Sequence, residues 1–320
     1  MRELNQTNKM NKIIELQTKP GIALSKQKMI KMHAFPFSLN TNIGCLTACR
    51  YCYLQNAPFK WHTDFGNEIK VKTWIADKLD KELESKKNLP QHLKRVQVNS
   101  ATEGYSPQGM HKVESQLGRD IMAELLEVFR KHWLSGNKWM VHLVTKSHLI
   151  QKHLPLIAGM KDQVQVELTI TSLSETRARD LEGFASSVSK RLDIIHDFSA
   201  AGVFVRVMCM PFIGDRADAM VVRDKCISLG ASGFKHKGMN YWDDDEMLKG
   251  NLVHQGGKHD TIFSDLLVRS GEPVFGVNAS TSTVSMVMPD KKWKKMTNRD
   301  MTIIDSGYSA CNSVNWGYIK

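Results

Sequence analysis

Between residues 37 and 240 the sequence alternates six times between a strand pattern and a helix pattern. The strand segments have apolar residues at every second position, or are short runs of β-branched and aromatic residues. The helix segments have apolar residues three or four positions apart. Such alternation is typical of parallel strands joined by helical crossovers. The predicted strands lie within 37–44, 95–99, 139–145, 163–171, 203–211 and 232–240.

The predicted helices lie between these strands, at 73–87, 116–134, 148–159, 188–202 and 217–230. A chain of this kind closes either as an open doubly wound sheet or as a barrel. In both folds the loops after the carboxyl ends of the strands build the functional site. We therefore expect an α/β fold whose site residues directly follow the strands.

Charge and periodicity divide the chain into three expected parts. Residues 1–36 form a basic lead-in, with seven Lys or Arg against two acidic residues in the first 33 positions. Residues 37–240 hold the strand–helix units. Residues 241–320 form a smaller C-terminal extension with a looser pattern, which we expect to cap the substrate side. Within it, residues 260–271 have a helix pattern.

The composition is that of a large globular protein: 320 residues, of which 42% are hydrophobic. No apolar run approaches the roughly 20 residues that a membrane span needs. The amino-terminal segment lacks the apolar stretch of a secretory signal, so we expect a cytoplasmic protein with reduced thiols. Its six cysteines therefore do not indicate a disulfide framework.

The chain is basic, with 44 Lys or Arg against 33 Asp or Glu and a net charge of +11. The segment 291–295, "KKWKK", places Trp293 among four lysines. A basic face with an aromatic side chain is typical of nucleic-acid binding. It is also typical of a solvated surface that keeps a protein soluble.

Three cysteines, Cys45, Cys49 and Cys52, fall in one short loop after the first predicted strand. Gathered thiols in a reducing compartment point to a metal or to catalysis. Iron–sulfur clusters are commonly held by four cysteine thiolates, so three would leave one iron open to a small molecule. Zinc with a distant fourth ligand, or three cysteines packed on one helix face, are the alternatives.

The stretch Cys45-Leu-Thr-Ala-Cys49-Arg-Tyr-Cys52 resembles the C-x3-C-x2-C motif of the radical S-adenosylmethionine (SAM) enzymes, including the aromatic Tyr51. The resemblance implies that Cys45, Cys49 and Cys52 bind a 4Fe–4S cluster whose open iron binds SAM. Such enzymes cleave SAM reductively to a 5′-deoxyadenosyl radical, which abstracts a hydrogen atom from the substrate. It also implies a partial (β/α)6 barrel of the TIM type and a one-electron reductant of the flavodoxin or ferredoxin type.

Further segments resemble the spore photoproduct lyase-like branch of these enzymes, over residues 12–240. They are, in chain order, 21–45, "TEGYSP" at 102–107, "VTKS" at 144–147, "LTIT" at 168–171, "DLEGFASSVSKRL" at 180–192 and "VMCMPFI" at 207–213. This resemblance implies a lyase of the DNA-repair type, acting on a nucleic acid or a nucleotide. The basic charge agrees with such a substrate.

The branch resemblance also implies roles for single residues. Thr102 and Glu103 would face the amino group of SAM, and Lys146 its carboxylate or ribose. A lysine suits this place because it offers a cation to a carboxylate. Thr169 and Thr171 would bond the ribose hydroxyls, and Met210 would flank the adenine. Tyr51, the aromatic of the cysteine motif, is also implied in cofactor binding.

The sequence departs from the branch at three positions. Glu103 stands where the branch has Asp, Gly183 where Pro is common, and Ser100 where a spore photoproduct lyase has its hydrogen-donating cysteine. A serine O–H bond is too strong to donate a hydrogen atom to a carbon radical. The candidate donors elsewhere in the chain are Cys209, Tyr105, Tyr241 and Cys311.

Two other functions stay open from the sequence. One is a radical SAM enzyme that acts on a small metabolite. The other is a basic nucleic-acid-binding protein without enzymatic activity, in which the cysteines hold a structural zinc or iron–sulfur site.

Overall fold

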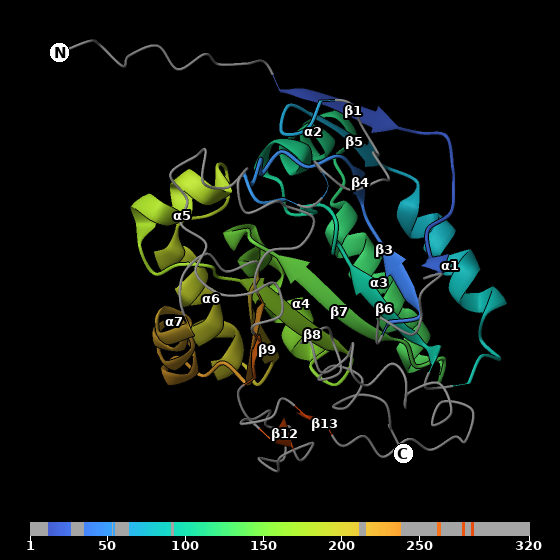
Figure 1. The fold of residues 1–320 in the computed structure, drawn as a ribbon. Helices are drawn as coiled ribbons and strands as arrows, with labels where there is room; N and C mark the ends of the chain where they lie inside the picture. The colour runs from blue at the N-terminus through green and yellow to red at the C-terminus, as the bar shows by residue number, and fades with distance from the viewer. Residues whose placement is uncertain are drawn as a thin grey trace, which may run out of the picture.

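Six parallel strands form the centre of the molecule, in the order in which they follow one another along the chain (Figure 1). The computed structural model describes residues 12–26, 35–52, 54, 64–90, 93–210 and 216–237, with three short strands beyond them. The parallel strands are β3 (Phe37–Leu39), β6 (Arg95–Val98), β7 (Met140–Thr145), β8 (Val164–Thr169), β9 (Phe204–Cys209) and β10 (Gly233–Lys237). This order confirms the expected α/β fold of the partial-barrel type.

Antiparallel strands stand at both edges of this sheet. β2 (Ser25–Lys26) pairs with β3, and β11 (Thr261–Phe263) pairs with β10. The helix predicted at 260–271 is therefore wrong at its start, because Thr261–Phe263 is drawn into the sheet by the free edge of β10. A separate short hairpin joins β12 (Val277–Asn278) to β13 (Thr283–Val284).

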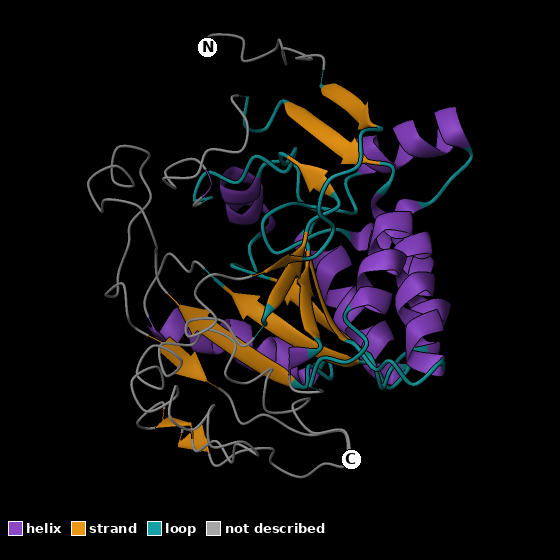
Figure 2. Ribbon diagram, turned by 90° about the vertical axis from the view of Figure 1, so that its right-hand side faces the viewer, coloured by secondary structure: helices purple, strands orange, loops and turns teal. Residues whose placement is uncertain are grey.

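Helices pack against the sheet, as Figure 2 shows, except α2, which lies against the strand Ile13–Gln17 near the amino terminus. They are α1 (Ile75–Ser85), α2 (Pro107–Leu117), α3 (Ile121–Leu134), the 3-10 helix η4 (His148–His153), α4 (Leu154–Gly159), α5 (Glu175–Glu182), α6 (Val188–Ala200) and α7 (Arg216–Ser228). Among the described residues, none of these helices combines the length and apolar character needed to cross a bilayer.

The helix predicted at 116–134 is in fact two helices. Gly118 ends α2 in the left-handed conformation, with φ +62°, and Asp120 caps the start of α3 by accepting a hydrogen bond from the Ala123 N–H at 3.1 Å. The sequence carried a sign of α2, since Ser106 followed by Pro107 is a common helix start. The periodicity alone did not show the break.

The two faces of the sheet differ in chemistry because side chains alternate along each strand. The helix-facing side chains, such as Val166, Leu168 and Val205, are fully buried in one apolar core. The opposite face, called the inner face below, carries polar side chains. Its members include Ser38, His142, Glu167, Thr169 and Arg206.

A second, small sheet lies beyond the carboxyl end of β3 (Figure 1). It consists of β1 (Ile13–Gln17), β5 (Glu68–Lys72) and β4 (Asn42–Ile43), with β1 parallel and β4 antiparallel to β5. The sequence patterns did not predict it. The pairing of β1 with β5 attaches part of the basic lead-in to the segment that follows the cysteines. The loop that carries the cysteines lies between these two strands in the sequence.

Candidate functional site

The three cysteines lie in a loop, residues 44–52, which we call the cysteine loop. It begins at Gly44, whose φ is +86° and whose missing β-carbon would stand 2.4 Å from the Glu68 carbonyl oxygen. Only glycine fits this turn, because any side chain would collide with the small sheet. The Gly66 N–H also donates to the Cys45 carbonyl at 3.2 Å. The loop is therefore held on one side by the segment around β5.

The carboxyl end of α5 holds the other side of the cysteine loop. The Arg50 N–H donates to the Leu181 carbonyl at 2.8 Å, and the Phe184 N–H donates to the Thr47 carbonyl at 3.0 Å. These two backbone hydrogen bonds run in opposite directions between the segments. The loop thus takes its shape from a helix that follows it by more than a hundred positions in the sequence.

The three thiols are buried to different degrees, and burial is the main influence on their pKa. Cys49 is buried, while Cys45 and Cys52 are half-buried. Burial raises the pKa of each thiol, that of Cys52 to about 12, and the charges of Cys45 and Cys52 further raise the pKa of Cys49. The thiols therefore influence one another, and they need cations nearby to be held as thiolates.

The three thiols of the cysteine loop are a donor set of the kind that binds an iron–sulfur cluster. In the described part of the chain, no three His, Cys, Asp or Glu side chains are placed to share a single metal ion. The cysteines of a 4Fe–4S cluster need no such convergence, because each thiolate binds an iron of its own. Three mutually interacting thiols on one loop, with a lysine ammonium beside Cys49, are chemically suited to that group.

Lys146 lies next to the cysteine loop, directly after β7. Its Nζ is 3.1 Å from the Tyr51 hydroxyl oxygen and 3.4 Å from the Glu182 carboxylate. The Tyr51 hydroxyl donates to the same carboxylate. Burial alone would raise the pKa of Glu182, but the charges of Lys146 and Arg191 outweigh it and lower that pKa to about 2. The Glu182 carboxylate is therefore ionised at neutral pH.

Glu103, in the loop after β6, joins the cysteine loop to Lys146. Its carboxylate accepts hydrogen bonds from the Lys146 N–H at 2.8 Å, the Thr145 hydroxyl at 2.8 Å and the Tyr105 N–H at 3.0 Å. Burial raises the pKa of Glu103 despite these donors. Its charge also helps to raise the pKa of Cys45. The predicted residues Cys45, Glu103 and Lys146 are thus brought together by tertiary structure.

The other predicted cofactor residues lie at, or shortly after, the carboxyl ends of β6, β8 and β9. Thr102 is buried, with its hydroxyl 3.5 Å from the Asn40 amide oxygen. Thr171 donates to Glu182 at 3.0 Å. The Thr169 hydroxyl is buried on the inner face, and no described residue forms a hydrogen bond with it. Met210 follows β9 and is 8% exposed.

The structure describes two of the candidate hydrogen donors, Cys209 and Tyr105. Both lie near the residues above: the Tyr105 N–H donates to Glu103, and the Cys209 thiol is close enough to Glu182 and Lys146 for their charges to act on it. Cys209 is fully buried in the apolar core, close enough to Cys226 of α7 for the two thiols to affect each other. The fully buried Tyr105 directs its hydroxyl to His153 Nδ1, at 3.1 Å. Tyr241 and Cys311 lie outside the described residues, as does Trp293. The donor role stays a prediction.

Sequence reasoning missed two residues of this region, Glu182 and Arg191. Both are 1% exposed, and an Arg191 guanidinium nitrogen lies 2.5 Å from the Glu182 carboxylate. The same nitrogen donates to the Thr169 carbonyl at 2.8 Å. The resembling segment 180–192 contained both, but only the structure shows them as a pair.

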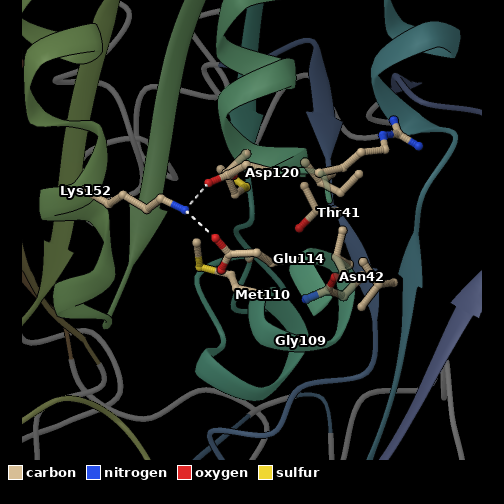
Figure 3. A pocket seen from close by; sticks show the side chains of 13 residues that line it. Thr41, Asn42, Gly109, Met110, Glu114, Asp120 and Lys152 are labelled. Atoms are coloured by element: carbon tan, nitrogen blue, oxygen red, sulfur yellow. Dashed lines mark ion pairs between the residues drawn. The ribbon is translucent and has the colours of Figure 1, made fainter. Parts of the chain in front are cut away.

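A pocket that opens to solvent lies between α2, α3 and η4 (Figure 3). The Lys152 ammonium reaches Asp120 at 2.9 Å and Glu114 at 3.8 Å across it. None of the predicted cluster or SAM residues lines this pocket. We therefore place the candidate site at the cysteine loop, where the thiols, Glu103 and Lys146 meet, and treat this pocket as separate.

Sequence comparison finds relatives whose own functions are not described. No protein-family model matches the chain. An uncharacterized protein of Methanocaldococcus jannaschii is 25% identical over 218 residues, which cover 65% of this chain and 72% of that protein. An uncharacterized protein of Mycobacterium tuberculosis is 26% identical over 203 residues, covering 62% of this chain and 55% of its own length. The chain thus spans about half of the mycobacterial relative.

Solved structures of spore photoproduct lyase share the fold. One cysteine-variant structure has a TM-score of 0.52 at 14% identity, covering 72% of this chain and 63% of the lyase chain. Another has a TM-score of 0.53 at 11% identity, covering 96% of this chain and 86% of that chain. A third, with bound AdoMet and dinucleoside spore photoproduct, has a TM-score of 0.50. The resemblance to the spore photoproduct lyase-like radical SAM enzymes is confirmed at the level of the fold.

Proposed function

We propose that this chain is a radical SAM enzyme. The observation that carries the proposal is the meeting of the cysteine loop with Glu103 and Lys146 at the carboxyl ends of β6 and β7. These residues come from separate units of the barrel, and the strand ends are where this type of fold builds its sites. Two further observations support the proposal. The fold is similar to that of spore photoproduct lyase, and the C-x3-C-x2-C motif supplies three cysteine ligands for a cluster.

Cys45, Cys49 and Cys52 would hold the 4Fe–4S cluster. When bound, the cluster supplies the electron for reductive cleavage of SAM to a 5′-deoxyadenosyl radical. The protein's own contribution is electrostatic: the Lys146 charge lowers the pKa of Cys49, against the effect of burial, and so favours the thiolate. A reductant of the flavodoxin or ferredoxin type would deliver the electron.

Glu103, Lys146 and Thr169 would bind SAM through complementary charges and hydrogen bonds. The Glu103 carboxylate accepts three hydrogen bonds, which leaves room among its roughly four acceptor positions for an ammonium group. Lys146 would pair with the carboxylate of SAM. The buried Thr169 hydroxyl, which bonds to no described residue, suits a ribose hydroxyl.

The substrate we propose is a nucleic acid or a nucleotide, processed by a lyase of the DNA-repair type. The net charge of +11 supports it, as does a related lyase structure that contains a dinucleoside spore photoproduct. Retention of nucleic acid during purification, lost with rising salt, would favour it over a small metabolite.

The test of the radical SAM assignment is anaerobic reconstitution with iron and sulfide, followed by dithionite reduction and SAM addition. We expect 5′-deoxyadenosine by mass spectrometry and a change in the cluster's electron paramagnetic resonance (EPR) spectrum on adding SAM. Cys49→Ala should abolish both. Cys226→Ala, which removes a buried thiol outside the loop, is the matched control. A reconstituted protein whose spectrum SAM leaves unchanged, and which forms no 5′-deoxyadenosine, would refute the assignment.

A further inference from the structure

Glu182, the last residue of α5, lies where four separate elements meet. Its carboxylate accepts hydrogen bonds from Tyr51 of the cysteine loop and Thr171 after β8, and it forms ion pairs with Lys146 after β7 and Arg191 of α6. The side chain is 1% exposed. One carboxylate thus connects the cysteine loop to three elements of the barrel.

A buried carboxylate is unfavourable unless it is fully paired, since desolvation costs several kcal/mol per ion. Two cations and two hydroxyls surround the carboxylate here: Tyr51, Thr171 and Lys146 contact Oε1, and Arg191 forms its ion pair with Oε2. A plain structural ion pair would need Arg191 alone, which is as deeply buried as Glu182. The additional contacts to Lys146 and Tyr51 go toward the cysteine loop. Helix stability does not explain them, because Glu182 ends its helix and a carboxylate there opposes the helix dipole.

Lys146 differs from its partners in that its side chain is 18% exposed. Its ammonium therefore sits at the border between the buried carboxylate and the open side of the site. The ring of Tyr51 lies below it, with Nζ 5.3 Å from the ring centroid. Held by the carboxylate and the ring, the ammonium has a defined position from which it still reaches a ligand.

We propose that Glu182 is a positioning residue of this site: it holds the Lys146 ammonium and the Tyr51 hydroxyl against the cysteine loop, so that Lys146 is oriented for the carboxylate of SAM. The proposal rests on the proposed function. It adds that the affinity for SAM depends on a residue that does not touch SAM. It also adds that a fixed negative charge lies close to Cys49.

Glu182→Gln tests this by removing the charge while keeping the size and one acceptor oxygen. We expect SAM to bind the cluster-loaded variant about tenfold or more weakly in calorimetry, since Lys146 loses its anchor. We expect the cluster's reduction potential to become more positive, because a buried negative charge beside it disfavours reduction. Glu182→Asp, which keeps the charge, should recover part of both.

Two comparisons separate positioning from general structural damage. Glu175→Gln changes a carboxylate on the same helix that accepts the Val188 and Ser189 N–H groups, away from Lys146, and should leave SAM affinity and potential unchanged. In a Lys146→Met background, Glu182→Gln should not weaken SAM binding further, because the residue it acts through is gone.

A readout without the cluster is hydrogen exchange in the metal-free protein. Exchange in residues 44–52 should accelerate in Glu182→Gln and not in Glu175→Gln. If Glu182→Gln does not fold, Thr171→Val removes one hydrogen bond to the carboxylate and should accelerate exchange in residues 44–52 more weakly.

The outcomes are distinguishable. If the wild-type protein does not bind SAM, the proposed function fails. If it binds SAM and Glu182→Gln binds equally well, with the same potential and the same loop exchange, the positioning role is wrong while the proposed function stands. Equal losses of affinity from Glu182→Gln in the presence and absence of Lys146 would also overturn the positioning role.

Discussion

Gly183 lies so close to the cysteine loop that a β-carbon on it would stand 2.8 Å from the carbonyl oxygen of Thr47. Its φ of +49° is closed to proline, which the related enzymes commonly have at this place. The backbone conformation at position 183 is thus a physical reason for glycine, and not proline, to stand there. The chain turns sharply here because the end of α5 packs directly on the loop.

Gly183→Ala should destabilise the protein more than Gly118→Ala. Both glycines have positive φ, so each substitution carries a backbone cost of about 1–2 kcal/mol. A β-carbon on Gly118 would meet no atom within 4 Å, whereas one on Gly183 collides with the cysteine loop. We expect a further loss of about 1–3 kcal/mol from that collision. Urea unfolding of both variants measures it, and equal losses would contradict the close packing.

The buried pair of Glu167 and Arg206 on the inner face should be costly to break. Both side chains are fully buried and lie 2.7 Å apart, and His142 contacts the same carboxylate oxygen. Arg206→Met leaves that carboxylate without its cation, so we expect a loss of about 3–5 kcal/mol. Glu127→Gln, which removes an exposed pair with Arg130, should cost no more than about 1 kcal/mol.

The double variant Glu167→Gln/Arg206→Met should be less destabilised than the sum of the two single variants, because no uncompensated charge remains buried. Chemical unfolding of the wild type, the two single variants and the double variant gives the coupling free energy between Glu167 and Arg206. Additive losses would mean that the two groups do not act as a pair.

Asp120 should make stability fall in acid. Burial would raise its pKa, but hydrogen bonds from His153, Lys152 and the Ala123 N–H outweigh it and hold that pKa well below its ordinary value. A carboxyl with a lowered pKa in the folded state stabilises fully above its unfolded pKa, and this contribution is lost as the pH falls below about 4. Unfolding free energies from pH 5 to pH 2 measure the effect.

Asp120→Asn is the matched variant, because asparagine also caps a helix. Its stability should depend less steeply on pH below about 4 than that of the wild type. Parallel curves for the two proteins would show that Asp120 keeps an ordinary pKa.

Without a cluster, the cysteine loop should react slowly with alkylating agents. Burial raises the pKa of Cys52 to about 12, so little thiolate exists at pH 8. The greater nucleophilicity of a basic thiolate offsets part of this, and we expect alkylation by iodoacetamide about 100-fold slower than in urea-unfolded protein. Peptide mass spectrometry of metal-free protein follows Cys52 directly. Reaction as fast as in urea would show an exposed thiolate.

The sequence by itself determined the six strand–helix units, their parallel arrangement and the place of the cysteine loop after the first strand. These features follow from local periods of two and of about 3.6 residues, which each segment carries regardless of its neighbours. The resemblance of segments 102–107 and 144–147 to the spore photoproduct lyase-like enzymes also pointed to Glu103 and Lys146, which the structure brings beside the thiols.

Only the tertiary structure decided how the loop is held. The small sheet of β1, β5 and β4, the contact of Gly183 with Thr47, and the carboxylate of Glu182 among its partners all join segments far apart in the sequence. No local pattern encodes which distant groups share a buried charge, because burial and pairing arise only when the elements pack together.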